Sequence, residues 1–267
     1  MSFKDVYEAV RKGTVEQVKY YIEEKSIDIN TKDENGVPLL SMVAGSNPDI
    51  EVVKYFLSKG ANVNGKDNGG WTALHGAVSY NPNIEVAKYL VAQGADVNAR
   101  SNGQGMAPIH LACLNNPSIE IIEFLLSKGV DVNMKSYVNM TPLHCCVTNK
   151  NVRVNVLDFL VSKGADMYAR NTDGWIPFHQ ACADNPNVDV IVFFLAKNID
   201  INIKGQNNST ALHFASQFNP NIEVLKTLIK YKADLNALAN APNGATYKPV
   251  QCASTDEKKN LLNQAMR

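Results

Sequence analysis

A short motif recurs along this chain at a nearly constant interval. The stretch GWTALHGA at residues 70–77 returns as GMAPIHLA at 105–112, and further altered copies follow. The five histidines of the chain share one place in the motif and lie 35, 34, 35 and 34 residues apart: His75, His110, His144, His179 and His213. A fixed period of about 20 to 50 residues indicates small units that stack on one another to bury a shared core. The repeat therefore predicts a linear array.

Each copy predicts two short helices. In the copy that contains His75, an apolar segment starts at Ala73 and Asn81-Pro82-Asn83 interrupts it, because proline after asparagine favours a turn. Apolar spacing from Ile84 suits a second helix, which Gly94 ends in the left-handed conformation. An asparagine then marks the loop in most copies, with Tyr168 as the exception: Asn30, Asn64, Asn98, Asn133, Asn202 and Asn236.

These residues resemble the ankyrin repeats, whose motif opens with Thr-Pro-Leu-His-x-Ala. The stretch TPLHCC at Thr141 is the best match. The resemblance implies an all-α ankyrin-repeat solenoid of stacked helix-turn-helix units with projecting hairpin loops, in a single domain over 1–267. We expect an N-terminal cap at 1–34, full repeats at 36–68, 70–102, 104–137, 139–172, 174–206 and 208–240, and a C-terminal cap at 244–267.

The chain departs from the family pattern in two places. Its units are slightly longer than the usual ~33 residues, mostly in the Asn-Pro-Asn turn. The glycine after the second helix becomes Asn198 and then Lys232, and a left-handed lysine costs ~1 kcal/mol. We therefore expect the C-terminal units to open first. In the closing helix, Ser254 and Glu257 predict a capping box.

The composition excludes several classes of partner and location. Basic and acidic residues balance at 26 each, so no net positive field would attract nucleic acid or an anionic membrane. The sequence has no run of about 18 apolar residues and no secretory signal. Five cysteines without a short-spaced framework agree with a reducing compartment, so we expect a cytoplasmic protein. The polar closing helix argues against assembly through the ends and favours a monomer.

The histidines allow a functional and a structural interpretation. His110 with Cys113, and His179 with Cys182, share a helix face and suggest metal ligands. However, equivalent histidines of stacked units would lie ~8 to 10 Å apart, whereas zinc ligands converge at ~2.0 to 2.3 Å from the metal. The resemblance implies instead that the histidine hydrogen-bonds within and between neighbouring loops. We therefore expect no metal, no cofactor and no catalytic residues.

The cysteines are expected to be reduced residues that differ in exposure. Cys113, Cys146 and Cys182 occupy places where other copies have small residues, so we expect them to be buried. Cys145 and Cys252 follow the histidine position directly, and we expect them to be more exposed and to react sooner. His144 beside Cys145 does not make a nucleophile, because neighbours in sequence on a helix point in different directions.

The resemblance implies that a partner binds along the concave face, which is built from the loop tips and the first helices. Just before the motif, four successive copies carry a large side chain that would form an exposed stripe, and Trp is frequent in binding hot spots. Packing of these side chains onto adjacent loops is the alternative. Three further aromatic residues would widen the surface. The candidate partner-binding residues are Trp71, Met106, Met140, Trp175, Tyr80, Tyr137 and Phe218.

The sequence thus predicts a non-enzymatic protein-interaction module that binds a protein partner through its concave face. A second hypothesis is that the chain is the substrate of a modifying enzyme. Ankyrin loop asparagines can be hydroxylated, and Asn98 and Asn133 lie in ADVN and VDVN contexts that resemble acceptor sites.

Overall fold

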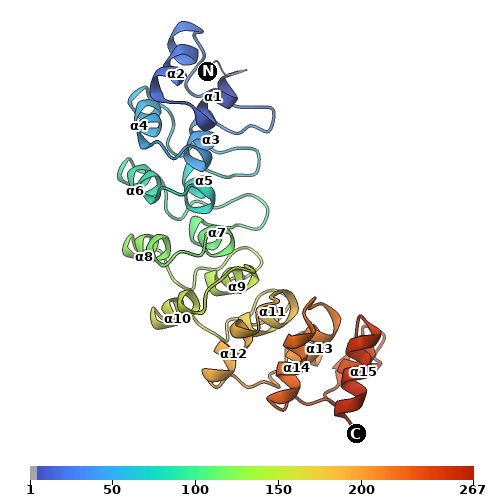
Figure 1. The fold of residues 1–267 in the computed structure, drawn as a ribbon. Helices are drawn as coiled ribbons and strands as arrows, with labels where there is room; N and C mark the ends of the chain where they lie inside the picture. The colour runs from blue at the N-terminus through green and yellow to red at the C-terminus, as the bar shows by residue number, and fades with distance from the viewer. Residues whose placement is uncertain (1–4) are drawn as a thin grey trace. The chain divides into compact units, whose positions relative to one another are not determined.

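The computed structural model describes residues 5–267, so the predicted N-terminal cap at 1–34 starts outside the described residues. The chain folds into two compact units, one that ends at Asp131 and one that begins at Val132, and each is described by itself. Both are built from pairs of short helices joined by loops (Figure 1). Among residues 5–267, no helix is long and apolar enough to span a membrane.

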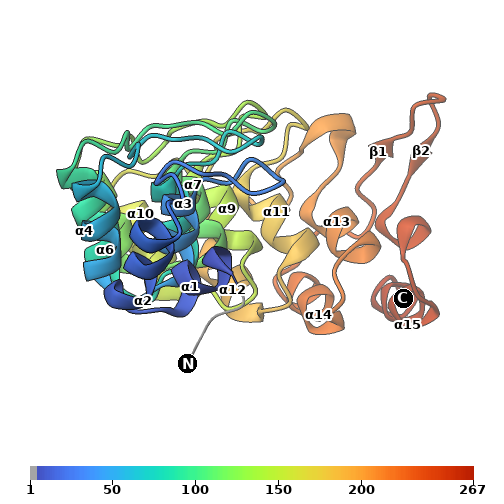
Figure 2. The same ribbon diagram turned by 90° about the horizontal axis from the view of Figure 1, so that it is seen from above.

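The first unit contains four helix pairs. The first helices of the pairs pack in sequence order, α1 on α3, α3 on α5 and α5 on α7, and α2, α4 and α6 pack in a second row (Figure 1). The long loops between pairs run along one edge (Figure 2). The elements are α1 (Val6–Lys12), α2 (Val15–Lys19), a π-helical turn (Tyr20–Glu24), α3 (Leu39–Ser46), α4 (Ile50–Ser58), α5 (Ala73–Tyr80), α6 (Ile84–Ala92), α7 (Pro108–Asn115) and α8 (Ile119–Ser127).

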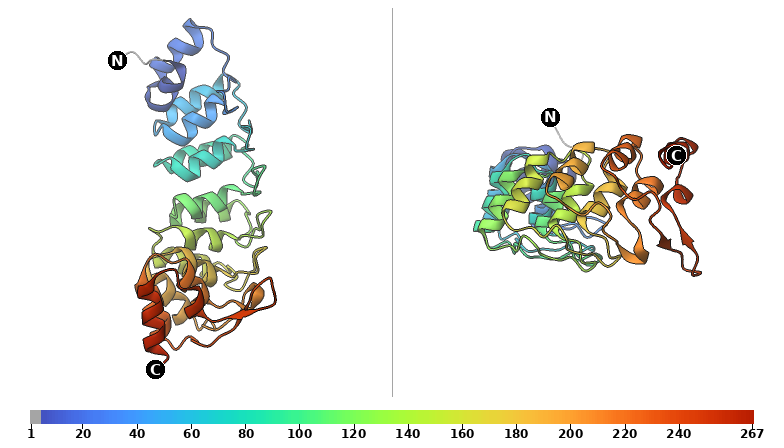
Figure 3. Two further views of the ribbon diagram at one scale, coloured as in Figure 1. Left: turned by 90° about the vertical axis from the view of Figure 1, so that its right-hand side faces the viewer. Right: turned by 90° about the horizontal axis from the view of Figure 1, so that it is seen from below.

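The second unit repeats this arrangement and ends in a different way. Its first helices α9, α11 and α13 pack in order, and so do α10, α12, α14 and α15 (Figure 3). A short antiparallel hairpin pairs Ala239 with Tyr247 before the last helix. The elements are α9 (Pro142–Thr148), α10 (Val154–Ser162), α11 (Pro177–Asp184), α12 (Val188–Ala196), α13 (Ala211–Gln217), α14 (Ile222–Lys230), β1 (Ala239–Asn240), β2 (Thr246–Tyr247), α15 (Asp256–Ala265) and two 3-10 turns (Gln206–Asn208, Pro249–Cys252).

The predicted helix-turn-helix organisation is confirmed. First helices begin at the alanine or proline of the motif, as at Ala73 and Pro108, and second helices begin directly after the Asn-Pro-Asn turn, as at Ile84. The residue before the histidine is buried in every copy of the motif and forms the centre of the core between stacked first helices: Leu74, Ile109, Leu143, Phe178 and Leu212. In each unit, we call the surface formed by the first helices and the loop tips the first-helix face.

The second helices end in the left-handed conformation that the sequence predicts. Gly94 has φ +91° and Gly164 has φ +93°, and nothing lies within 4 Å of a Cβ built on either glycine. The replacements keep this conformation, with φ +59° at Asn198 and φ +64° at Lys232. A residue with a Cβ is strained there, and lysine lacks the short polar side chain that eases the strain in asparagine.

Lys232→Gly is therefore expected to raise the free energy of unfolding by about 1 kcal/mol, because glycine adopts this conformation without steric cost. Denaturant unfolding of the two proteins measures the difference. Gly164→Lys is the reciprocal control, since its Cβ would meet no neighbour and the backbone cost alone should lower stability by a similar amount. A neutral or destabilising Lys232→Gly would show that Lys232 is not strained.

The start of α15 differs from the sequence prediction by one residue. The N-cap is Thr255, whose Oγ1 accepts a hydrogen bond from the Lys258 amide at 3.3 Å, so the predicted capping box at Ser254 and Glu257 is wrong. Ser254 instead ties α15 to α13, because its amide donates to the Ser216 carbonyl at 3.1 Å. The ammonium of the buried Lys258 also donates hydrogen bonds to the Ser216 carbonyl and to the Ala215 carbonyl.

Candidate interaction surface

The histidines connect successive loops. His75 Nδ1 accepts a hydrogen bond from the Thr72 amide at 3.1 Å, which places the ring proton on Nε2, and Nε2 donates to the Met106 carbonyl at 3.1 Å. His144 donates in the same way to Trp175 at 3.0 Å. The predicted hydrogen bonding within and between loops is therefore confirmed. Equivalent bonds join His179 to Ile203 and His213 to Tyr247.

Burial favours the neutral form of His75, His179 and His213. Desolvation lowers the pKa of His75 to about 4 and the pKa of His179 to about 4, although each carbonyl that accepts the Nε2 proton opposes the shift. Burial also lowers the pKa of His213. Protonation would place a hydrogen on Nδ1, the ring nitrogen that accepts the hydrogen bond from the backbone amide. That hydrogen bond would be lost, so the charged form fits poorly. The histidines therefore serve the architecture of the loops.

A buried asparagine ties four of the turns to the preceding repeat, and the sequence did not predict this contact. Asn81 Nδ2 donates to the carbonyls of Ala44 at 2.9 Å and Asn47 at 2.8 Å, while its Oδ1 accepts from the Asn83 amide at 2.9 Å. The same two-carbonyl contact recurs at Asn47, Asn185 and Asn219. The recurrent Asn-Pro of the sequence marks this position, but the dipeptide by itself predicts only a turn.

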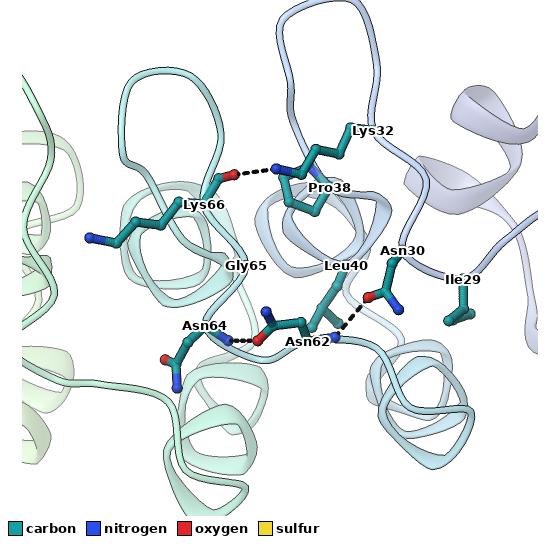
Figure 4. Close-up of a pocket in the computed structure, with 9 residues that line it drawn as sticks. All are labelled: Ile29, Asn30, Lys32, Pro38, Leu40, Asn62, Asn64, Gly65 and Lys66. Carbon is teal, nitrogen blue, oxygen red and sulfur yellow. Dashed lines mark hydrogen bonds between the residues drawn. The ribbon is translucent and has the colours of Figure 1, made fainter.

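The loop asparagines form a second connection between repeats. Asn30 Oδ1 accepts from the Asn62 amide at 2.9 Å, and the Lys32 ammonium donates to the Lys66 carbonyl at 2.9 Å (Figure 4). These residues line a cavity of about 510 Å³ in the first unit. In the second unit, Asn133 Nδ2 donates to the Gly164 carbonyl at 2.8 Å and its Oδ1 accepts from Asp166. The amides of these asparagines hold the spacing of the loops.

The first unit contains three of the candidate partner-binding residues. Tyr80 is 69% exposed at the end of α5, and Trp71 is half-buried with its ring edge-to-face against His75 at 5.1 Å between centroids. Met106 is only 4% exposed, so the expectation that it belongs to an exposed stripe is wrong. The hydrogen bonds that its amide and carbonyl make with Ser101 hold it within its loop.

Trp71, Tyr80 and Met106 nevertheless line one open groove of about 740 Å³ on the first-helix face. We call this cavity the first-unit groove. It lies over α3, α5 and α7, and its wall also includes the basic residue Arg11 of α1 and the apolar residue Leu111 of α7. The sequence predicted Trp71 and Met106 in one column in register, with Tyr80 widening the same surface, and it did not predict the groove itself.

Short residues account for the groove. Ser41 stands where the later copies carry the motif histidine, and Gly76 stands where other copies carry a longer side chain, as at Leu111. A Cβ on Gly76 would lie 3.3 Å from the Cα of Gly45, so the backbones of α3 and α5 approach closely here. Without the longer side chains, the first-helix face between these helices stays open.

In the second unit the candidate residues form an aromatic cluster. The Trp175 ring packs against Phe214 at 4.2 Å and Phe218 at 6.4 Å between centroids. Trp175 is half-buried and Phe214 is buried, whereas Phe218 is half exposed. Trp175 therefore takes part in packing and also reaches the surface. Two more candidates belong to this unit, Met140, which is half-buried, and Tyr137, which is exposed.

The cysteines follow the prediction with one exception. Cys113, Cys146 and Cys182 are buried as expected, and Cys252 is half-buried. Cys145 is also buried, so the expected exposure is wrong. Its side chain is short, and α11 packs against α9. Burial raises the pKa of the Cys145 thiol well above its usual range and that of Cys252 to about 11.

Comparison with known proteins agrees with this architecture. A family model described as ankyrin repeats in three copies matches residues 6–101, 100–171 and 149–239. The structure is similar to the crystal structure of the human ASB11 ankyrin repeat domain, with 23% identity, a TM-score of 0.71, and coverage of 87% of this chain and 99% of that chain. A search of curated protein sequences found no match.

A second solved structure, from Bdellovibrio bacteriovorus, is the predatory endopeptidase Bd0816 in complex with immunity protein Bd3460. It matches with 31% identity and a TM-score of 0.57 over 68% of this chain and 92% of that chain. The family model spans most of the sequence, and the helix pairs, loops and histidine contacts of the structure repeat in the same register. The chain belongs to the ankyrin-repeat family.

Proposed function

We propose that this chain is a non-enzymatic scaffold that binds a protein partner through its concave face, the surface that we describe as the first-helix face. Ankyrin repeats are generally protein-protein interaction modules. The observation that carries the proposal is the open groove with the strongly exposed Tyr80 on its wall. Large exposed aromatic residues beside an apolar groove are typical of interaction hot spots.

The stacked units make this surface rigid before a partner arrives. Several loops and turns are fixed by buried hydrogen bonds from a histidine or an asparagine to the neighbouring repeat, as at His75 and Asn81. A rigid surface loses less conformational entropy on binding than mobile loops lose. The solved complex of an endopeptidase with an immunity protein supports a protein as partner.

The proposal also covers the oligomeric state, the location and the classes of partner that are excluded. We propose a monomer in the cytoplasm whose partner is neither nucleic acid nor a membrane. The 26 basic and 26 acidic residues leave no net charge to attract polyanions.

Affinity capture from the lysate of the native host, with matched variants, tests the proposal. Tyr80→Ala and Phe218→Ala are expected to weaken binding of the captured protein by about 2 kcal/mol each, or roughly 30-fold, with little loss of stability, because both side chains are exposed. Trp71 and Trp175 give a less clear test, since truncation of a half-buried ring also costs stability.

Tyr231→Ala is the control, because Tyr231 is also exposed but follows the second helix α14. It should leave capture unchanged. Equal losses in all three variants would argue against the first-helix face, and so would unchanged capture by the Tyr80 and Phe218 variants.

The hydroxylase hypothesis has a distinct test. Addition of one oxygen at Asn98 or Asn133 would appear in the intact mass of protein purified from its native host. In the folded chain the Asn133 amide is engaged with Gly164 and Asp166, so an enzyme would have to displace these contacts if it needed that amide. We therefore favour the binding function.

A further inference from the structure

The shape and lining of the first-unit groove restrict the ligands that fit it. Trp71, Met42 and Leu111 make part of the groove wall apolar. Gly45 and Gly76 also line the groove and add no side chains that would fill it. A Cβ on Gly76 would lie 3.3 Å from the Cα of Gly45, so the close packing of α3 on α5 requires short residues here and leaves the space above them unfilled. The opening of about 740 Å³ is within the range of pockets that bind compact ligands or a few residues of a peptide.

A hydroxyl group in the groove wall lacks a hydrogen-bond partner. Within residues 5–267, the Oγ of Ser41 is buried and makes no hydrogen bond, whereas Ser46 and Ser79 donate to the carbonyl four residues earlier. A buried polar group without a hydrogen-bond partner is energetically unfavourable. A rotation about χ1 would turn this hydroxyl toward a ligand in the groove. A carbonyl or carboxylate oxygen of that ligand would then accept its hydrogen bond.

The charges at the groove favour an acidic ligand. Arg11 is exposed at one end, and in the described part of the chain its guanidinium contacts Met42 Sδ at 3.7 Å and forms no ion pair. The other charged residue of the wall, Asp67, is already engaged, because its Oδ1 accepts from the amides of Gly69 at 2.8 Å and Trp71 at 2.9 Å. A carboxylate from a partner would pair with Arg11 in good geometry.

We infer that the first-unit groove binds an extended segment of a protein partner that inserts one large apolar side chain between Trp71 and Leu111 and places an acidic side chain at Arg11. The inference rests on the proposed function and specifies the chemistry of the partner. The apolar side chain fills the space above Gly45 and Gly76. A main-chain carbonyl of the segment accepts from the Ser41 hydroxyl.

A displayed library of random 12-residue peptides tests this inference on the full chain. The selected peptides are expected to combine a large apolar residue with Asp or Glu a few positions away. Binding of one synthetic selected peptide should fall at least tenfold in Arg11→Glu, because the charge that faces the carboxylate is reversed. Lys12→Glu is the matched control, since it makes the same charge change on the same helix but lies outside the groove wall.

The outcomes separate this inference from the general proposal. Selection of basic peptides, no selection over an unrelated protein, or equal loss in Arg11→Glu and Lys12→Glu would overturn the groove inference. If Arg11→Glu abolished peptide binding but the lysate partner still depended on Phe218, the chain would use both surfaces. If lysate capture depended on Phe218 and no peptide were selected, the binding function would stand without the groove ligand.

Discussion

Acidification from pH 7 to pH 5 is expected to lower the free energy of unfolding by several kcal/mol. The unfolded chain takes up protons on its histidines near pH 6.5, whereas the folded chain holds the pKa of His75 and of His179 at about 4. Between these values the unfolded state binds more protons, so stability is full above pH 6.5 and falls as the pH drops toward 4. At pH 5 the linkage amounts to about 2 kcal/mol for each of these two histidines.

Denaturant unfolding at a series of pH values measures this effect. Carboxylates with a lowered pKa, such as Glu23, lose their contribution below their ordinary value of 4.5, so the range from pH 7 to 5 isolates the histidines. His75→Gln removes one titrating group and should reduce the loss of stability between pH 7 and 5 by about 2 kcal/mol, the share of that histidine. A free energy of unfolding that stays constant from pH 7 to 5 would show that the imidazoles can be protonated in place.

Asn185→Ala is expected to destabilise the protein by about 3 to 5 kcal/mol. Its side chain is fully buried and donates to the carbonyls of Val147 at 2.8 Å and Asn149 at 3.1 Å, while it accepts from the Asn187 amide at 2.8 Å. Truncation leaves these backbone groups without partners in a buried turn, and each costs about 1 to 3 kcal/mol. The free energy of unfolding in denaturant gives the value directly.

Asn187→Ala is the matched control two residues away. Asn187 caps α12 by accepting from the Asp189 amide, and loss of an N-cap costs about 1 kcal/mol. The same chemical change should therefore have a much smaller effect. Equal losses in the two variants would contradict the interpretation that the buried asparagine joins successive repeats.

The sequence predicted those features that depend on regular spacing. The period located the helix starts at Ala73 and Pro108, and the glycine positions located the left-handed ends, including that at Lys232. These features repeat in every unit, so a single chain contains several copies of the signal. The structural interpretation of His75 was correct for the same reason, because this histidine recurs at one place of the motif in five successive copies.

Features that depend on contacts between units were not predicted. Exposure of Met106 and Cys145 depends on the neighbouring loop or helix that covers each side chain, and no periodic pattern records that. The role of Asn81 was missed because a turn asparagine and a buried bridging asparagine look alike in sequence. The groove lies where Ser41 and Gly76 replace longer side chains of the other copies. A pattern of recurring residues does not record such replacements.

Side-chain footprinting of the complex with the captured partner tests the central claim most directly. Hydroxyl radicals label exposed aromatic rings, and Tyr80 and Phe218 on the first-helix face are as accessible in the free chain as Tyr20 and Tyr231 after second helices. We predict that the partner protects Tyr80 or Phe218 from labelling and leaves Tyr20 and Tyr231 unchanged. Protection of Tyr20 and Tyr231, with continued labelling of Tyr80 and Phe218, would contradict binding through the first-helix face.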